Sequence, residues 1–174
     1  MRLRSIFVSV ATLGLMVAPA FLHAMSAGAR AECTITGTAA DDDLTGTTRD
    51  DVICAKAGSD DVFGLEGNDE IRGGQGSDTG LAGEDGSDVV KGQQDDDQVC
   101  GNDQSDDLYG GQGADKIGGD LSGSNCAPLS SVSEGGNDFL KSRDHVSGND
   151  TVDGGDNTDT CHIDAGDQVD NCEL

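Results

Sequence analysis

The chain has 174 residues, with 34 Asp and Glu against 10 Lys and Arg, and its formal net charge is −24. This charge excludes a nucleic-acid binder, which needs a basic surface for phosphates, and it disfavours docking on anionic membranes. There is no Trp, and four Phe, one Tyr and 27 Gly are present. A conventional aromatic core is therefore excluded, and the chain is either disordered or held together by disulfides or metal ions.

The first segment has the pattern of a targeting sequence. Two arginines precede an apolar stretch over residues 6–22, and two overlapping A-x-A patterns follow over residues 27–31. This predicts a signal peptide over residues 1–31 and a secreted, extracellular protein that begins at Glu32. An uncleaved membrane anchor is the alternative, but the stretch is shorter than the ~20 residues of a spanning helix. Cleavage would remove three arginines and no acid, leave a net charge of −27 and end any membrane insertion.

A nine-residue period then runs over residues 37–118. Position 6 is Asp in all nine units, and position 8 is apolar in eight of them, with Gly80 as the exception. One extra residue is expected in the unit at residues 82–90. The first six positions have a turn composition, and the last three alternate as a short strand does. Each unit is therefore expected to form one turn followed by a three-residue strand.

Such short strands are stable only when they stack on copies of themselves. Two units make one closed coil of 18 residues, and the next coil lies ~4.8 Å further along. The sequence therefore predicts an all-β stack of coils over residues 32–118, with a continuous apolar ladder at position 8. Aspartates one coil apart fall on the same edge of this stack. One edge is expected to carry Asp42, Asp60, Asp78, Asp97 and Asp115, and the other Asp51, Asp69, Asp88 and Asp106.

Rows of carboxylates at this spacing point to a bound cation. Like charges ~4–5 Å apart repel by a few kcal/mol at the surface dielectric, and a divalent cation between them reverses the sign of that energy. Carboxylate and turn-carbonyl oxygens suit Ca²⁺, whereas Mg²⁺ demands stricter geometry and zinc prefers His or Cys. Solvated turn residues in a metal-free solenoid are the alternative. The strong negative charge disfavours that interpretation, because repulsion would then oppose a very thin core.

Two turns carry a known motif. Residues 73–78 (GGQGSD) and 110–118 (GGQGADKIG) match the nonapeptide G-G-x-G-x-D-x-U-x. The chain resembles haemolysin-type calcium-binding repeat proteins, also called RTX proteins, closely over residues 37–118 and more loosely over 134–170. The resemblance implies a right-handed parallel β-roll that holds several Ca²⁺ ions between turns of adjacent coils through the position-6 Asp side chains and backbone carbonyls. The motif is not kept at position 4 of four turns, which have Ala40, Arg49, Asp95 and Gln104.

The repeat pattern weakens toward the C-terminus. A Ser-rich inserted loop is expected over residues 119–133, followed by degenerate repeats and a C-terminal cap over residues 134–174. Three further aspartates keep position 6 in this last part. The full set of expected calcium ligands is Asp42, Asp51, Asp60, Asp69, Asp78, Asp88, Asp97, Asp106, Asp115, Asp138, Asp150 and Asp159.

The six cysteines all lie after the signal peptide, and an even number in an exported chain predicts three disulfides. We expect each cysteine to pair with its neighbour in sequence. One bond then fastens the N-terminal end, one holds the inserted loop and one closes the last coil. The three pairs are Cys33–Cys54, Cys100–Cys126 and Cys161–Cys172.

Motifs of other chemistry do not account for the sequence. An EF-hand that began at Asp41 would have Val52 at its twelfth position instead of Glu, and neither His145 nor His162 belongs to a zinc motif. The predicted function is therefore a secreted calcium-binding repeat protein whose folding is driven by Ca²⁺, not an enzyme, with no macromolecular partner indicated. A cell-surface structural or adhesive protein is one alternative. An accessory repeat module of a secreted enzyme or toxin is another, although little sequence outside the repeats is left for a catalytic domain.

Overall fold

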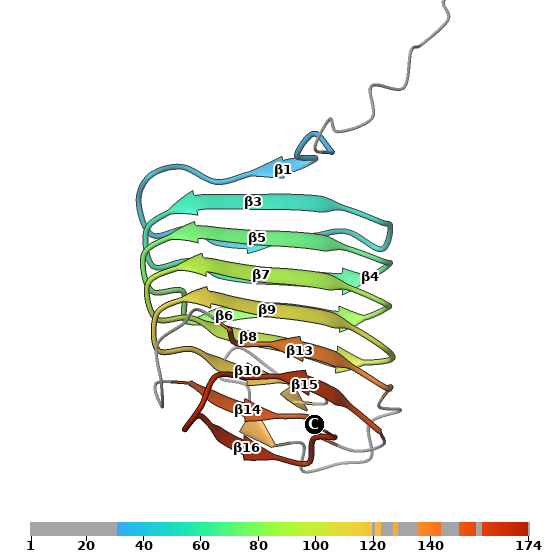
Figure 1. The fold of residues 1–174 in the computed structure, drawn as a ribbon. Helices are drawn as coiled ribbons and strands as arrows, with labels where there is room; N and C mark the ends of the chain where they lie inside the picture. The colour runs from blue at the N-terminus through green and yellow to red at the C-terminus, as the bar shows by residue number, and fades with distance from the viewer. Residues whose placement is uncertain are drawn as a thin grey trace, which may run out of the picture. The chain divides into compact units, whose positions relative to one another are not determined.

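The computed structural model describes residues 31–119, 121–122, 127–128, 136–143, 150–155 and 158–173, all within the unit Ala31–Leu174. Apart from its last residue, the predicted signal peptide lies outside the described residues, as does much of the predicted inserted loop. Within the described part, short strands lie one above another in two sheets (Figure 1).

Both sheets are parallel and have seven strands among the described residues. Sheet 1 contains, from one end to the other, β1 (Ile35–Thr36), β3 (Val52–Ala57), β5 (Glu70–Gln75), β7 (Val89–Gln94), β9 (Asp107–Gln112), β13 (Phe139–Lys141) and β15 (Thr160–His162). Sheet 2 contains, in the same direction, β2 (Asp43–Thr45), β4 (Asp61–Glu66), β6 (Gly80–Asp85), β8 (Gln98–Asp103), β10 (Lys116–Gly118), β14 (Thr151–Asp153) and β16 (Gln168–Asp170). A small antiparallel pair is formed by β11 (Leu121–Ser122) and β12 (Ala127–Pro128).

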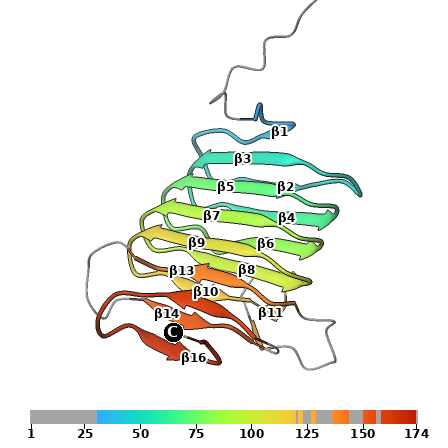
Figure 2. The same cartoon turned by 45° about the vertical axis from the view of Figure 1, so that its right-hand side comes forward.

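The chain alternates between the two sheets, so each strand pairs with the strand one coil away (Figure 2). Ile53 lies beside Ile71, and Ile71 lies beside Val90. From β1 to β10 this register repeats every 18 residues, or every 19 where an extra residue enters. Beyond β10 the spacing is irregular, and Leu140 lies beside Leu108 and Val152 beside Ile117. The predicted coil length and the parallel β-roll are confirmed, and the chain is an all-β solenoid of stacked coils.

The core is a narrow ladder between the sheets, to which each strand contributes one inward side chain at position 8. Each coil contributes two inward side chains from position 8, and those of the interior coils are at most 3% exposed. The ladder consists of Ile53, Val62, Ile71, Leu81, Val90, Val99, Leu108, Ile117, Leu140, Val152 and Cys161. At its two ends the packing side chains are only partly buried, and these are Ile35, Leu44, Ile163 and Cys172. Each coil therefore depends on its neighbours for burial.

The place of the extra residue differs from the sequence-based expectation. Leu81, not Gly80, fills position 8 of its unit. It is fully buried and lies in register between Val62 and Val99. The extra residue is therefore between Asp78 and Leu81, and not in the unit at residues 82–90. The apolar ladder is continuous because the chain accommodates one extra residue here, which lets Leu81 face the core.

Strand length also differs from the expected three residues. The strands from β3 to β9 each have six residues and continue through position 3 of the following turn. They do so with a left-handed backbone at position 2. Their non-glycine residues there have φ between 79° and 92°, and they are Lys56, Leu65, Glu84, Gln93 and Asn102. The sequence pattern missed this because side chains other than Gly rarely adopt such a φ.

Two of the three predicted disulfides are confirmed. Cys33–Cys54 spans 21 residues at the N-terminal end of the stack, and Cys161–Cys172 spans 11 residues at the other end. The remaining prediction, Cys100–Cys126, involves a cysteine outside the described residues. Within the part of the chain that the structure describes, no helix has the length and apolarity needed to cross a membrane.

Candidate metal-binding turns

The position-6 aspartates form two ladders, one along each edge where the chain passes between the sheets. In both ladders the carboxylate Oδ1 accepts a hydrogen bond from the backbone N–H of the aspartate one coil earlier, over 2.7–3.0 Å. The first edge carries Asp42, Asp60, Asp78, Asp97, Asp115 and Asp150. The second edge carries Asp51, Asp69, Asp88, Asp106, Asp138 and Asp159. The predicted alignment is confirmed, and it continues into the degenerate repeats.

These carboxylates are buried, which is unusual for an acidic group. From Asp51 onward every position-6 aspartate is between 0% and 8% exposed. Burial, helped by the negative charges of neighbouring aspartates, raises the pKa of Asp78 and Asp88 to about 6 and that of Asp97 to about 8. The backbone N–H bond to each carboxylate acts in the opposite direction. A buried carboxylate of this kind needs a compensating positive group.

The second carboxylate oxygen lacks a hydrogen-bond donor in the middle of the stack. This Oδ2 atom is inaccessible to solvent and has no donor in Asp60, Asp69, Asp78, Asp88 and Asp97. A buried acceptor without a partner costs about 1–3 kcal/mol, and more when it is charged. Five such atoms recur in equivalent turns along the two edges, and a buried charged acceptor without a partner calls for a positive group beside it.

Backbone carbonyls approach the same place. A Cβ added to Gly73 would overlap Asp78 Oδ2 and would also meet the carbonyl oxygen of Gly92 in the next coil. A Cβ on Gly92 would likewise overlap Asp97 Oδ2 and meet the Gly110 carbonyl. Glycine at position 1 thus leaves a cradle where a carboxylate oxygen and a carbonyl oxygen converge.

The donor set of this cradle fits calcium. It consists of hard oxygens, without sulfur or imidazole, which is the choice of Ca²⁺ and not of zinc. Among the described residues no three acidic, His or Cys side chains gather at one point. Each turn would therefore hold an ion with few side chains and with backbone carbonyls beside them.

The space at position 1 gives a direct prediction. We expect Gly73→Ala to weaken calcium binding and to destabilise the calcium-loaded fold by about 1–3 kcal/mol, because its Cβ would displace Asp78 Oδ2. Isothermal calorimetry and calcium-dependent melting would measure both effects. Gln75→Ala, which changes an exposed side chain in the same turn, is the control. Equal behaviour of the two variants would contradict the cradle.

A second row of polar side chains closes the outside of the turns. At position 5, Asp41 Oδ1 accepts the Ser59 N–H (2.9 Å), and Asp96 Oδ1 accepts the Ala114 N–H (2.8 Å). Asn68 Oδ1 accepts the N–H of position 5 in the next coil in the same way. This row was not predicted from the sequence, although Asp, Asn and Ser recur at position 5. Its contribution is coil-to-coil hydrogen bonding.

The first two turns differ from the rest. Asp42 Oδ2 accepts hydrogen bonds from the Thr38 N–H (2.6 Å) and Oγ1 (2.9 Å). Asp51 Oδ2 accepts them from the Thr47 N–H (2.9 Å) and Oγ1 (2.7 Å). Asp51 Oδ1 also accepts the Thr34 hydroxyl, and these bonds lower the pKa of Asp51, the Thr47 side chain most. The nine-residue period alone places both aspartates in one set with the others.

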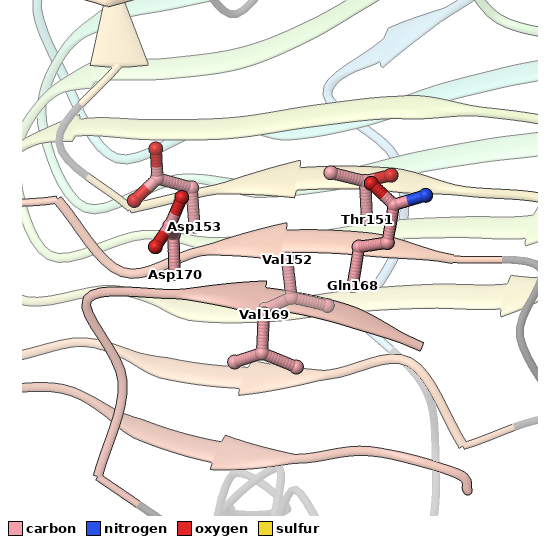
Figure 3. A pocket seen from close by; sticks show the side chains of 6 residues that line it. All are labelled: Thr151, Val152, Asp153, Gln168, Val169 and Asp170. Atoms are coloured by element: carbon pink, nitrogen blue, oxygen red, sulfur yellow. The ribbon is translucent and has the colours of Figure 1, made fainter. Parts of the chain in front are cut away.

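A hollow of about 370 Å³ lies at the C-terminal end of the stack, over β14 and β16. Figure 3 shows its lining as side chains stacked in pairs, with Asp153 near Asp170 and Val152 near Val169. Asp153 Oδ1 accepts the side-chain amide of Asn171 (2.9 Å). None of its lining residues is a position-6 aspartate, so this hollow is separate from the candidate metal-binding turns.

The fold and the turns together define a class of protein, a parallel β-roll with oxygen-lined turns for metal ions. Comparison with known families agrees, since four copies of the RTX calcium-binding nonapeptide repeat match residues 36–64, 55–85, 82–117 and 147–167. These matches cover more than half of the chain, which therefore belongs to the RTX (haemolysin-type) calcium-binding repeat family. No match was found among curated proteins or among solved structures.

Proposed function

We propose that this chain is a secreted protein whose β-roll folds when its turns bind calcium. The observation that carries the proposal is the row of buried Oδ2 atoms without donors in the middle of the stack. Those atoms lie beside carbonyl oxygens of the next coil. The net charge of −24 adds repulsion that the narrow core must overcome.

The mechanism is linkage between folding and binding. Bound calcium would supply the positive charge that the buried carboxylates lack. The carboxylates and carbonyls converge only when coils are stacked, so the folded chain has sites that the unfolded chain does not. Each site occupied at 100 times its Kd would then add about 2.7 kcal/mol to the stability.

Secretion would bring the protein to an environment with enough calcium to occupy its turns. Extracellular calcium modules have Kd values of ~10⁻⁴–10⁻³ M. A chain with sites of that strength would stay unfolded at low calcium and would fold after export. The proposed signal peptide over residues 1–31 supports this order of events. N-terminal sequencing of the protein from culture medium is expected to begin at Glu32.

We propose a binding or structural role and not a catalytic one. The buried acidic groups of the described residues recur in equivalent turns on successive coils, which suits repeated ion binding. A cell-surface structural or adhesive role, or attachment to a secreted enzyme or toxin, is compatible with the same sites. Cell-wall fractionation would separate a surface-bound protein from a freely released one.

The decisive test is a calcium titration of residues 32–174, purified with their disulfides formed, and followed by circular dichroism. In calcium-free buffer we expect little β structure, because the buried carboxylates have no counter-charge. Added CaCl₂ is expected to produce the β signal cooperatively, and the same concentration of MgCl₂ is not. A full β signal in calcium-free buffer would refute calcium-driven folding.

A further inference from the structure

We infer that the first two turns of the roll are closed by threonine instead of calcium, so that Asp42 and Asp51 are not calcium ligands. This inference rests on the proposed function, because it divides the position-6 aspartates into those that bind an ion and those that do not. The residue at position 2 of each turn decides whether its aspartate binds an ion. That residue is Thr38 in the first turn and Thr47 in the second.

The first reason is that the relevant oxygen is already occupied. Oδ2 of Asp78 and Asp88 is buried and has no donor. Oδ2 of Asp42 and of Asp51 instead accepts two hydrogen bonds each, one from a threonine N–H and one from its hydroxyl. An ion would have to displace both of these bonds to reach that oxygen. The carboxylate therefore has the stabilisation that the later turns lack.

The second reason is the backbone at position 2. In the turns that follow β3 to β9, position 2 has a positive φ and continues the strand, as Gly74 (126°) and Gln93 (92°) illustrate. Thr38 and Thr47 are not among the described residues with positive φ, and β1 and β2 end two residues before them. A β-branched side chain disfavours positive φ. Each threonine N–H therefore leaves the ladder and turns toward the aspartate.

The third reason is the positive charge of the Lys56 side chain. The Lys56 ammonium donates to the carbonyl oxygen of Gly37 over 2.8 Å. That carbonyl belongs to position 1 of the first turn, whereas the carbonyl that converges with Asp42 Oδ2 is that of Ala55 in the next coil. Lys56 follows Ala55 in the chain, so its fixed ammonium places a positive charge beside this turn, and that charge repels a calcium ion. Further along the same edge, position 2 is uncharged, with Gly74, Gln93 and Gly111.

The arrangement suits the end of a stack. A terminal coil has a neighbour on one side only, so groups of its own chain must replace the contacts that a further coil would make. Threonine donors, the Lys56 ammonium and the Cys33–Cys54 disulfide close this end with groups of the chain itself. The calcium-binding turns would then lie further along the stack.

Counting bound ions tests the inference. The protein would be compared with two double variants, Asp42→Asn with Asp51→Asn, and Asp78→Asn with Asp88→Asn. Each pair changes one aspartate on each edge and removes the same charge, and asparagine can still accept the threonine bonds. Native mass spectrometry at saturating calcium is expected to give an unchanged ion number for the first pair and a smaller one for the second.

The outcomes separate the inference from the proposed function. Loss of ions from both pairs would overturn the inference and leave calcium binding by the ladder intact. Loss from neither pair would overturn both, because the ladder would then not bind the ions. If a variant fails to fold, the wild-type protein crystallised with terbium gives the same answer by anomalous scattering. An ion bound to Asp42 or Asp51 would refute the inference, and ions at Asp78 and Asp88 alone would support it.

Discussion

Replacing Asp97 with asparagine is expected to change stability in opposite directions with and without calcium. Asp97 is 2% exposed, and its Oδ2 is buried without a donor. Asparagine removes the buried charge, so the calcium-free protein should retain more β structure. The same change removes a ligand, so saturating calcium should stabilise the variant less, by up to about 2.7 kcal/mol if one site is lost at 100 times its Kd.

The β signal by circular dichroism in calcium-free buffer and thermal melting at saturating CaCl₂ would measure the two effects. Asp96→Asn is the matched control, because it removes the same charge from the adjacent, exposed residue whose carboxylate accepts the Ala114 N–H. We expect Asp96→Asn to change both measurements little. If both variants respond alike, total charge and not the buried position decides the stability.

Lowering the pH is expected to stabilise the calcium-free fold, and so to substitute in part for calcium. Burial raises the pKa of Asp78 and Asp88 to about 6 and of Asp97 to about 8 in the fold, above the ordinary value of 3.8. The folded state therefore keeps protons that the unfolded state releases. This contribution to stability is fully present below pH 3.8 and is lost as the pH rises through about 6 to 8. In calcium-free buffer, the β signal should grow as the pH falls from 8 to 5.

The ion pairs of Glu70 do not change the predicted pH dependence between pH 8 and pH 5. Arg72 and Lys91 lower the pKa of Glu70 to about 2, from an ordinary value of 4.5. Its stabilising effect is therefore present above pH 4.5 and is lost only as the pH falls toward 2. At saturating calcium the trend should reverse, because protons compete with the ion for the carboxylates. A calcium-free chain that stays unfolded at pH 5 would contradict this prediction.

Much of the molecule could be predicted from the sequence because its period is short and strict. An Asp recurs at position 6 of each nonapeptide, and an apolar residue recurs at position 8. Only one register places the aspartates in the turns and the apolar side chains in the core. The coil length, the two aspartate edges and the apolar ladder follow from that register. The end disulfides could also be predicted, because Cys33–Cys54 spans little more than one coil and Cys161–Cys172 closes a short loop at the last edge.

Other features were decided only by the tertiary structure. Gly80 and Leu81 both fit the period within one residue, and burial of the larger apolar side chain selected Leu81. The sequence also treats Thr47 and Lys56 alike, as ordinary position-2 residues of a turn. Only the folded backbone separates them, because φ at position 2 decides where the N–H points. At Thr47 it points to Asp51 Oδ2, whereas at Lys56 the strand continues and Asp60 Oδ2 is left without a donor.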